Sequence, residues 1–136
     1  MPQILRHIEF IAQEKQRDVL FIRFGPKRNT GELPRSIDKW PASLKAKRKH
    51  LVAWLDKNTI GYEDCFPAGT LNCIAFPYDG TLYIDLPFDA AHSAYQSFIS
   101  KLENADGTPR DTEVVCFYIL LEHALGKIAD AVQDMD

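Results

Sequence analysis

The sequence lacks the short motifs that mark common catalytic and cofactor sites. Its seven glycines form neither a GxGxxG nor a GxxxxGKS/T phosphate loop, no GxSxG elbow is present, and none of its four histidines stands in an HExxH spacing. The three cysteines, Cys65, Cys73 and Cys116, are odd in number and contain no CxxC pair, so they indicate neither a disulfide framework nor a zinc site. We therefore predict no cofactor and no metal.

Long apolar runs are also missing. No stretch approaches the roughly 18 residues that a membrane span needs, and the segment 1–7 becomes polar too early for a secretory signal. With 136 residues, of which 46% are hydrophobic and 26% charged, the chain has the size and composition of a globular domain with its own core. We therefore expect one cytoplasmic domain over residues 1–136, with no membrane partner.

Hydrophobic periodicity predicts alternating helices and strands. Helices are expected at 2–15, 43–58, 89–102 and 114–132, and strands at 19–24, 62–66, 71–76 and 81–86. The first of these strands is almost continuously apolar, which favours a central strand covered on both faces. Asp79 and Gly80 predict a hairpin between the last two strands, and Asp89 is the expected N-cap of the third helix.

This order indicates an α/β fold, with α+β as the alternative. We expect a single-domain sandwich around a four-stranded mixed sheet, β-α-β followed by an antiparallel meander, covered by about four helices. In strand 81–86, Tyr83 and Asp85 should share the second face, which is either wetter than the core face or covered by polar partners. The segment 26–43 has three prolines and no period, so we expect a long irregular loop there, of a kind that is often functional or mobile.

Charge is distributed unevenly along the chain. Residues 1–58 carry 13 Lys and Arg against 6 Asp and Glu, whereas residues 59–136 carry 3 against 13. The folded surface must therefore hold either a dipole or internal ion pairs. Cations gather with an aromatic side chain in the predicted loop and the helix after it. This basic surface comprises Lys27, Arg28, Arg35, Lys39, Trp40, Lys45, Lys47, Arg48 and Lys49.

We interpret the chain as a small intracellular interaction or accessory protein that binds another macromolecule, expected to be a protein, through the basic surface. Cations beside an aromatic ring also suit phosphate contact and base stacking, so nucleic-acid binding is the alternative. Against it, the sequence pI is about 5.8 and no nucleic-acid-binding signature is present. A basic helix that merely packs beside acidic elements would show the same pattern.

An enzyme is the weaker alternative. Asp85 ends a predicted strand, and Asp89 and His92 open the next helix, so the three could converge as an acid–base group at one end of the sheet. Cys65 and Cys73 could act as nucleophiles only beside a base. An N-cap role for Asp89, a surface position for His92 and burial of the cysteines would explain the same residues structurally.

The last predicted helix carries a wide apolar stripe, from Val114 to Val132. One face of a sheet is too small to cover such a stripe completely, and a helix pair across a two-fold axis would bury the remainder. A homodimer through the C-terminal helix is therefore a further expectation.

Overall fold

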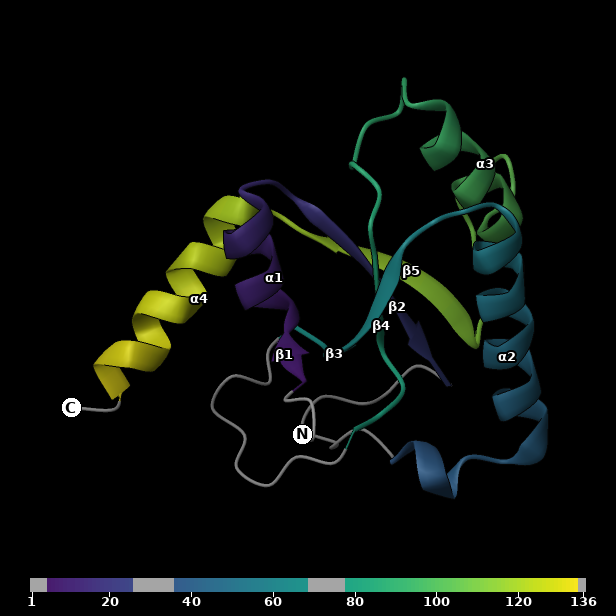
Figure 1. Cartoon of the computed structure of the whole chain (residues 1–136), viewed down its shortest axis with the longest axis horizontal. Helices are drawn as coiled ribbons and strands as arrows, with labels where there is room; N and C mark the ends of the chain where they lie inside the picture. Colours follow the sequence, from purple (N-terminus) through teal and green to yellow (C-terminus); the bar gives the residue numbers. More distant parts are fainter. Residues whose placement is uncertain (1–4, 26–35, 69–77, 135–136) are drawn as a thin grey trace.

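The computed structural model describes residues 5–25, 36–68 and 78–134 (Figure 1). Within these ranges the chain forms four α-helices and one five-stranded mixed sheet, which confirms a mixed α/β fold. The elements are β1 (Arg6–His7), α1 (Ile8–Lys15), β2 (Val19–Phe24), the short 3-10 helix η1 (Ile37–Lys39), α2 (Ala42–Lys57), β3 (Tyr62–Phe66), β4 (Leu82–Ile84), α3 (Ser93–Leu102), β5 (Val114–Ile119) and α4 (Leu121–Asp134). None of these helices combines the length and the apolar character that crossing a membrane requires.

The strands follow the connectivity of a split β-α-β sandwich. The order across the sheet is β1-β3-β4-β2-β5. β4 is antiparallel to both β3 and β2, so these two strands run parallel to each other with β4 between them, and β5 is antiparallel to β2 on its other side. The order from β2 to β5 is thus the β-α-β-β-α-β arrangement called ferredoxin-like. β1 extends the sheet, parallel to β3.

β2 is buried on both faces, as its apolar sequence predicts. Leu20 and Ile22 face a core that also contains side chains from α2 and α3, whereas Val19 and Phe21 face a second core with side chains from α1 and α4. Figure 1 shows these two helix pairs on opposite sides of the sheet. The molecule therefore has three layers, and each such buried side chain contributes on the order of 1.5–3 kcal/mol of hydrophobic stabilisation.

The prediction for the last helix is wrong in its first third. Val114–Ile119 form β5, which pairs with β2, and α4 starts only at Leu121. The run VVCFYI is rich in β-branched and aromatic side chains, which suit a strand. The helical spacing of apolar residues in α4 extends back into Val114–Ile119, and no Gly or Pro separates the two segments. The pattern therefore predicted one continuous helix. Within the described residues the sheet has five strands rather than four: three that were predicted, together with β5 and β1.

The first helix also starts later than predicted. α1 begins at Ile8, and Arg6–His7 are extended as β1 because they pair with Cys65 and Phe66 of β3. Positions 2–4 of the predicted helix lie outside the described residues. Pairing over two residues leaves no alternating pattern in the sequence, so periodicity could not reveal this strand.

His92, rather than Asp89, caps α3. The helix begins at Ser93, and the Nδ1 atom of His92 accepts a hydrogen bond of 3.4 Å from the backbone N–H of Tyr95. Asp89 acts in the preceding turn, where its Oδ1 atom accepts a hydrogen bond of 2.9 Å from the N–H of Ala91. The predicted N-cap is therefore wrong by about one helical turn.

β4 is the second arm of the predicted hairpin. Both of its edges are paired, one with β3 and the other with β2, and the predicted first arm, 71–76, lies outside the described residues. Leu82 and Ile84 face α2 and α3, but Tyr83 is only 3% exposed because it lies in the core beneath α1 and α4. At Tyr83 this second face is therefore covered, whereas Asp85 on the same face is exposed.

Only the end of the predicted loop 26–43 is described. It contains η1 and Trp40, and α2 begins at Ala42. The positions 26–35 lie outside the described residues, so three members of the basic surface, Lys27, Arg28 and Arg35, are not placed.

Candidate functional site

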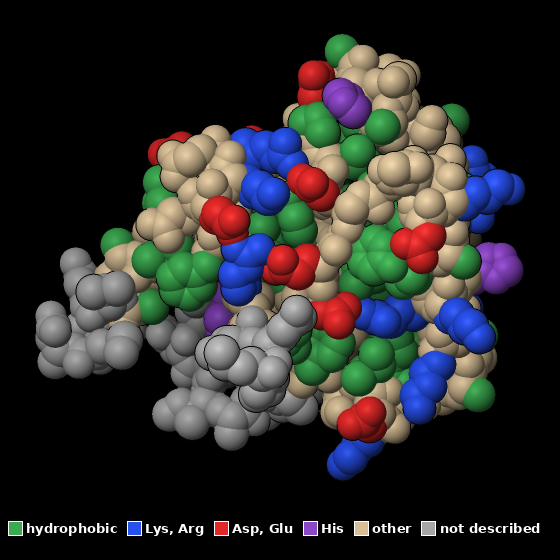
Figure 2. Space-filling model, in the orientation of Figure 1, with side chains coloured by type: hydrophobic (Ala, Val, Ile, Leu, Met, Phe, Trp, Pro, Cys, Tyr) green, Lys and Arg blue, Asp and Glu red, His purple; other side chains and the backbone are tan. Residues whose placement is uncertain are grey.

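Ion pairs between the two halves of the chain absorb much of the charge asymmetry. Arg6 donates two hydrogen bonds to Glu63, from Nε to Oε2 (3.0 Å) and from Nη2 to Oε1 (2.8 Å). Arg17 donates one hydrogen bond to Asp85, with 2.8 Å between Nη2 and Oδ1. Figure 2 shows the result: over the sheet, basic and acidic side chains alternate on this face. Basic side chains of residues 1–58 are thus paired within the fold with acidic side chains of residues 59–136.

Arg48 of the basic surface connects α2 to the segment that leads into β4. Its guanidinium donates hydrogen bonds to Oδ1 of Asp64 (2.8 Å), to the hydroxyl of Tyr78 (2.9 Å) and to the carbonyl of Gly80 (3.0 Å). The Tyr78 hydroxyl in turn donates to the carbonyl of Thr81 (2.9 Å). Arg48 therefore has a structural role that the sequence alone did not indicate.

Lys47 is also engaged inside the protein. Its Nζ atom lies 2.8 Å from Oε1 of Glu113 and 2.9 Å from Oδ2 of Asp111. The hydrogen bonds to Glu113 and Asp111 raise the pKa of Lys47, and the one from Lys47 lowers the pKa of Asp111. For Lys47 and Arg48, the interpretation of a basic helix that packs beside acidic residues is therefore correct.

Trp40 is buried and is not a stacking platform for a ligand. Its side chain is 6% exposed, and its ring lies 5.6 Å from the ring of Phe24, centroid to centroid. The indole also packs against Gly80, so closely that a Cβ atom at that position would clash with it. The aromatic part of the predicted macromolecule-binding surface is therefore part of the core.

Two of the remaining described cations of the basic surface, Lys45 and Lys49, line a groove between η1 and α2. Lys39, Lys45 and Lys49 are exposed, and in the part of the chain that the structure describes no acidic side chain forms an ion pair with them. Figure 2 shows Lys and Arg side chains along the edge of the molecule where α2 lies. This η1–α2 groove has a volume of about 410 Å³ and is lined by Ile37, Asp38, Lys45, Arg48, Lys49 and Val52.

The predicted acid–base residues are each held by a different local contact. Asp85 accepts hydrogen bonds from Arg17 and from the hydroxyl of Tyr83 (2.9 Å), while Asp89 and His92 serve the turn and the cap before α3. Burial raises the pKa of Tyr83 to about 12. Among the described residues no hydrogen bond joins Asp85 to Asp89 or His92, so the geometry gives no support to an acid–base site there.

The described cysteines are poor nucleophiles. Cys65 is fully buried, and desolvation, reinforced by the nearby Asp79, raises the pKa of its thiol well above the usual value. Burial likewise raises the pKa of Cys116 to about 12. Because the thiolate is the reactive form, neither group is activated at neutral pH. Cys73, the second predicted candidate, lies outside the described residues.

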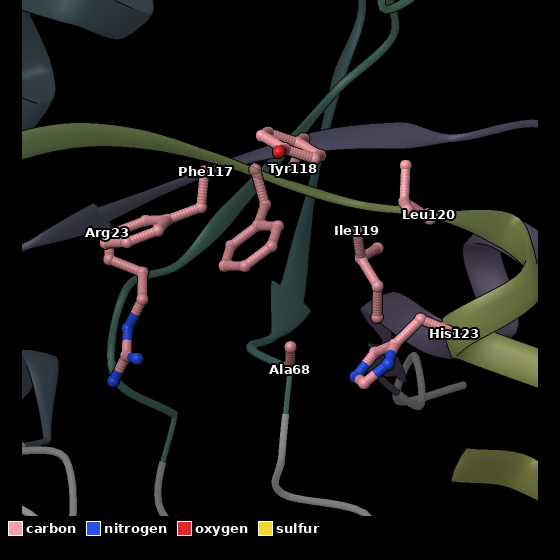
Figure 3. Close-up of a pocket in the computed structure, with 8 residues that line it drawn as sticks. Arg23, Ala68, Phe117, Tyr118, Ile119, Leu120 and His123 are labelled. Carbon is pink, nitrogen blue, oxygen red and sulfur yellow. The ribbon is translucent and has the colours of Figure 1, made fainter. Parts of the chain in front are cut away.

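A hollow that sequence reasoning missed lies on the opposite face of the sheet, beside α4. Figure 3 shows the side chains of Arg23, Phe117 and Ile119 projecting to the same side of the sheet, with Ala68 between Arg23 and His123. Phe117 is 44% exposed, and its ring stacks on that of Phe21 with 5.7 Å between the centroids. This β5 hollow has a volume of about 390 Å³, and its lining includes Phe21, Arg23, Ala68, Phe117, Ile119 and His123.

One signal in the sequence could have revealed the β5 hollow. Six consecutive apolar residues with β-branched and aromatic side chains favour a strand, and such a strand alternates its side chains between two faces. Because 114–119 was predicted as helix, nothing in the prediction placed Phe117 beside Phe21. The two residues are direct partners in the β2–β5 register. The pairing partner, however, is set by the whole sheet and not by this segment.

Comparisons with known proteins do not identify the chain: no family model, no curated protein and no solved structure matches it. Its function has to be inferred from its own surface. Two places stand out on the described surface, the η1–α2 groove with its lysines and the β5 hollow with its exposed aromatic ring.

Proposed function

We propose that this protein is an interaction module that binds an acidic segment of another protein in the η1–α2 groove. The observation that carries the proposal is the contrast within α2. Lys47 and Arg48 are occupied by acidic residues of the fold, whereas Lys45 and Lys49 line the groove and are exposed. Their charges are therefore available to a partner.

The chemistry of the groove defines the segment that fits it. Lys45 and Lys49 are four residues apart, so they lie on the same side of the helix, one turn from each other. Ile37 and Val52 add apolar surface between η1 and α2. A segment with Asp or Glu on either side of one aliphatic side chain would match both features. Exposed lysines favour such a partner mainly by steering its approach, and this effect weakens as salt rises.

Nucleic-acid binding has less support than an acidic protein segment. It needs several phosphate contacts and, for single strands, exposed aromatic rings that stack on bases. Trp40 is in the core, and Lys47 and Arg48 are neutralised by acidic neighbours. The cations that remain, Lys39, Lys45 and Lys49, suit a short acidic segment better than a polyanion.

Charge reversal tests the proposal. The double variant Lys45→Glu/Lys49→Glu should weaken binding of a fluorescein-labelled peptide, in which glutamates flank a single leucine, by about 10-fold or more at low salt. The matched control Lys57→Glu/Lys101→Glu changes the net charge equally at exposed positions outside the groove. It should change the peptide affinity by less than about 3-fold.

Fluorescence anisotropy at several salt concentrations measures both double variants. Equal weakening by the groove variant and the control would remove the proposal, because it would show only a net-charge effect. Failure of the peptide to saturate the wild-type protein would remove it as well. If a duplex oligonucleotide binds instead, with an affinity that falls steeply in a log–log plot against salt, nucleic-acid binding replaces it.

A further inference from the structure

We propose that the outer edge of β5 pairs with the β5 strand of a second copy of the chain, antiparallel across a two-fold axis at Phe117. The two five-stranded sheets then continue into each other as one sheet. This interface differs from the helix pair that the sequence predicts, because it is formed by the backbone of β5 and not by the side chains of α4. It is also independent of the η1–α2 groove.

The two edges of the described sheet are protected to different degrees. β1 forms one edge, is two residues long and contains Arg6, whereas β5 forms the other edge with six residues. None of the six is charged or a proline, and their register with β2 is continuous, without a bulge. Natural proteins guard an edge with short strands, charges, prolines or bulges. β5 has none of these protections, so its edge is suited to pairing.

The register of β5 shows which of its backbone groups reach the open edge. Gly25 lies opposite Glu113 in this register, and its N–H donates a hydrogen bond of 2.8 Å to the Glu113 carbonyl. Bonded and non-bonded pairs alternate along an antiparallel ladder, so every second residue from Glu113, including Phe117, directs its N–H and C=O groups toward β2. Cys116 and Tyr118 direct theirs outward. Among the described strands, none pairs with that side.

Apolar side chains are exposed on both faces of this edge. Phe117 faces the α1–α4 side, like its partner Phe21, and is 44% exposed; Tyr118 faces the α2–α3 side, like Cys116, and is 55% exposed. Phe88 stacks on Tyr118 with 4.4 Å between the ring centroids and is itself 41% exposed. A partner docked on one face would cover only one of these groups. An added strand covers both, because its own side chains alternate between the faces.

A second copy of β5 fits this edge in one register in particular. With Phe117 on the two-fold axis, Cys116 of each copy lies opposite Tyr118 of the other, and the outward groups of both residues form hydrogen bonds. The two Phe117 rings meet as a non-bonded pair, in which side chains are closer, and extend the stack of Phe21 on Phe117 at 5.7 Å in each copy. Since β5 has no charge, no like charges within it oppose each other across the axis. Registers displaced by two residues would separate the two rings.

Light scattering after size-exclusion chromatography tests the proposal with the whole chain. The wild-type mass should rise from 15.5 kDa toward twice that value as the protein concentration rises. Phe117→Lys sets two like charges against each other at the axis, so it should raise the dissociation constant of the dimer by about 100-fold or more. The matched control is Phe10→Lys, because Phe10 is 40% exposed on α1 and not on the edge. It should change this constant by less than about 3-fold.

Two changes at Tyr118 separate backbone pairing from loss of the ring. Tyr118→Thr removes the ring and keeps the N–H, whereas Tyr118→Pro also removes the N–H, which points outward and is not used by β2. The dissociation constant should therefore be about 10-fold or more higher for Tyr118→Pro than for Tyr118→Thr. Circular dichroism must show the same folded fraction in every sample. If Tyr118→Pro does not fold, Phe117→Lys and the crosslink below decide.

A disulfide locates the contact between the two copies. In a Cys73→Ser/Cys116→Ser background, Phe117→Cys should form an intermolecular disulfide under mild oxidation. The Cα atoms of a non-bonded antiparallel pair lie about 4.5 Å apart, which is within the range that a disulfide spans. Phe10→Cys in the same background is the control and should remain a reduced monomer on a non-reducing gel.

Three results would overturn the proposal. A wild-type mass of 15.5 kDa at every concentration would show that no second copy occupies the edge. Equal effects of Phe117→Lys and Phe10→Lys would show only a general effect of charge. A disulfide that forms faster through Leu125→Cys than through Phe117→Cys, in the same background, would place the contact on α4. No peptide is present in these measurements, so their failure leaves the proposed function standing.

Discussion

Asp18 accepts a hydrogen bond of 2.8 Å from the backbone N–H of Leu121, the first residue of α4. Asp18 directly precedes β2, and its neighbour Val19 pairs with Ile119 at the end of β5. The bond satisfies one of the N–H groups that the first turn of a helix leaves without an intrahelical partner. The start of α4 is thus fixed by a side chain 103 positions earlier in the sequence.

Removing this carboxylate should loosen the start of α4. We expect Asp18→Ala to lower the free energy of unfolding by about 0.5–2 kcal/mol, the usual cost of losing a helix-capping side chain. Asp18→Asn keeps an acceptor oxygen and should lose much less. Urea unfolding followed by circular dichroism measures both variants. If Asp18→Ala is as stable as wild type, the bond does not hold α4 in place.

Gly80 should be hard to replace because of Trp40. Its backbone has a φ of +86°, and the indole ring occupies the space that a Cβ atom would need. Gly80→Ala should therefore cost about 2–4 kcal/mol, from left-handed strain and overpacking together. Gly107→Ala is the matched control, since Gly107 has a φ of +88° with open space around it. There only the backbone cost of about 1–2 kcal/mol applies. Equal losses in thermal unfolding would show that the ring moves aside freely.

Cys65 should resist alkylation in the native protein. Its thiol is buried and its pKa is raised well above the usual value, so little thiolate is present or accessible at pH 8. In a Cys73→Ser background, we expect iodoacetamide to label Cys65 only after unfolding and Cys116 more slowly than a free thiol. Peptide mass spectrometry after timed labelling distinguishes the two sites. Rapid labelling of native Cys65 would restore it as a candidate nucleophile.

Acid should destabilise the fold through His7. The imidazole lies 5.0 Å from the ring of Phe66, centroid to centroid, and burial lowers its pKa below the ordinary 6.5. The neutral form is favoured in the folded state, so this contribution to stability is present above pH 6.5 and is lost as the pH falls through the lowered pKa. The stability difference between wild type and His7→Gln should shrink over that window. A difference that stays constant from pH 7 to pH 5 would contradict the prediction.

Self-association through α4 remains a proposal that the exposed apolar side chains of the C-terminal region favour. Leu120 is 44% and Leu125 41% exposed. Size-exclusion chromatography with light scattering should show a dimer at high protein concentration. Leu125→Lys should return it to a monomer without loss of helix content. A wild-type mass that stays at 15.5 kDa at every concentration would exclude this dimer.

The central layer of the fold was predictable because its signal is local. β2 and β3 have the predicted bounds, 19–24 and 62–66, since each run carries enough apolar or β-forming residues between turn signals. β5 was not predictable in the same way. The helix and strand patterns overlap from Val114 to Leu121, and what separates them is pairing with β2 and the cap from Asp18. Both contacts lie about a hundred positions away, where a periodicity window does not reach.

The candidate site shows the same division between local and distant information. The sequence correctly indicated a basic helix at α2, but it gave no sign of the groove between η1 and α2. It did not reveal that Arg48 binds Asp64 and Gly80, or that Trp40 packs on Phe24. A cation or an aromatic ring has the same appearance in a sequence whether it serves the core or a partner. Only the contacts that it makes across the fold decide between these roles.

The interior position of β2 in the sheet, between β4 and β5, has a consequence for the newly made chain. β2 is synthesised early, yet the strand on one of its sides is β5, and Val19 pairs with Ile119. At typical synthesis rates of about 5–20 residues per second, some 5–20 seconds pass before that neighbour exists. For this interval a strand that is buried on both faces of the folded protein has an open edge, the form in which strands pair wrongly. A chaperone that holds extended apolar segments would protect this chain most between the emergence of Phe24 and that of Val114.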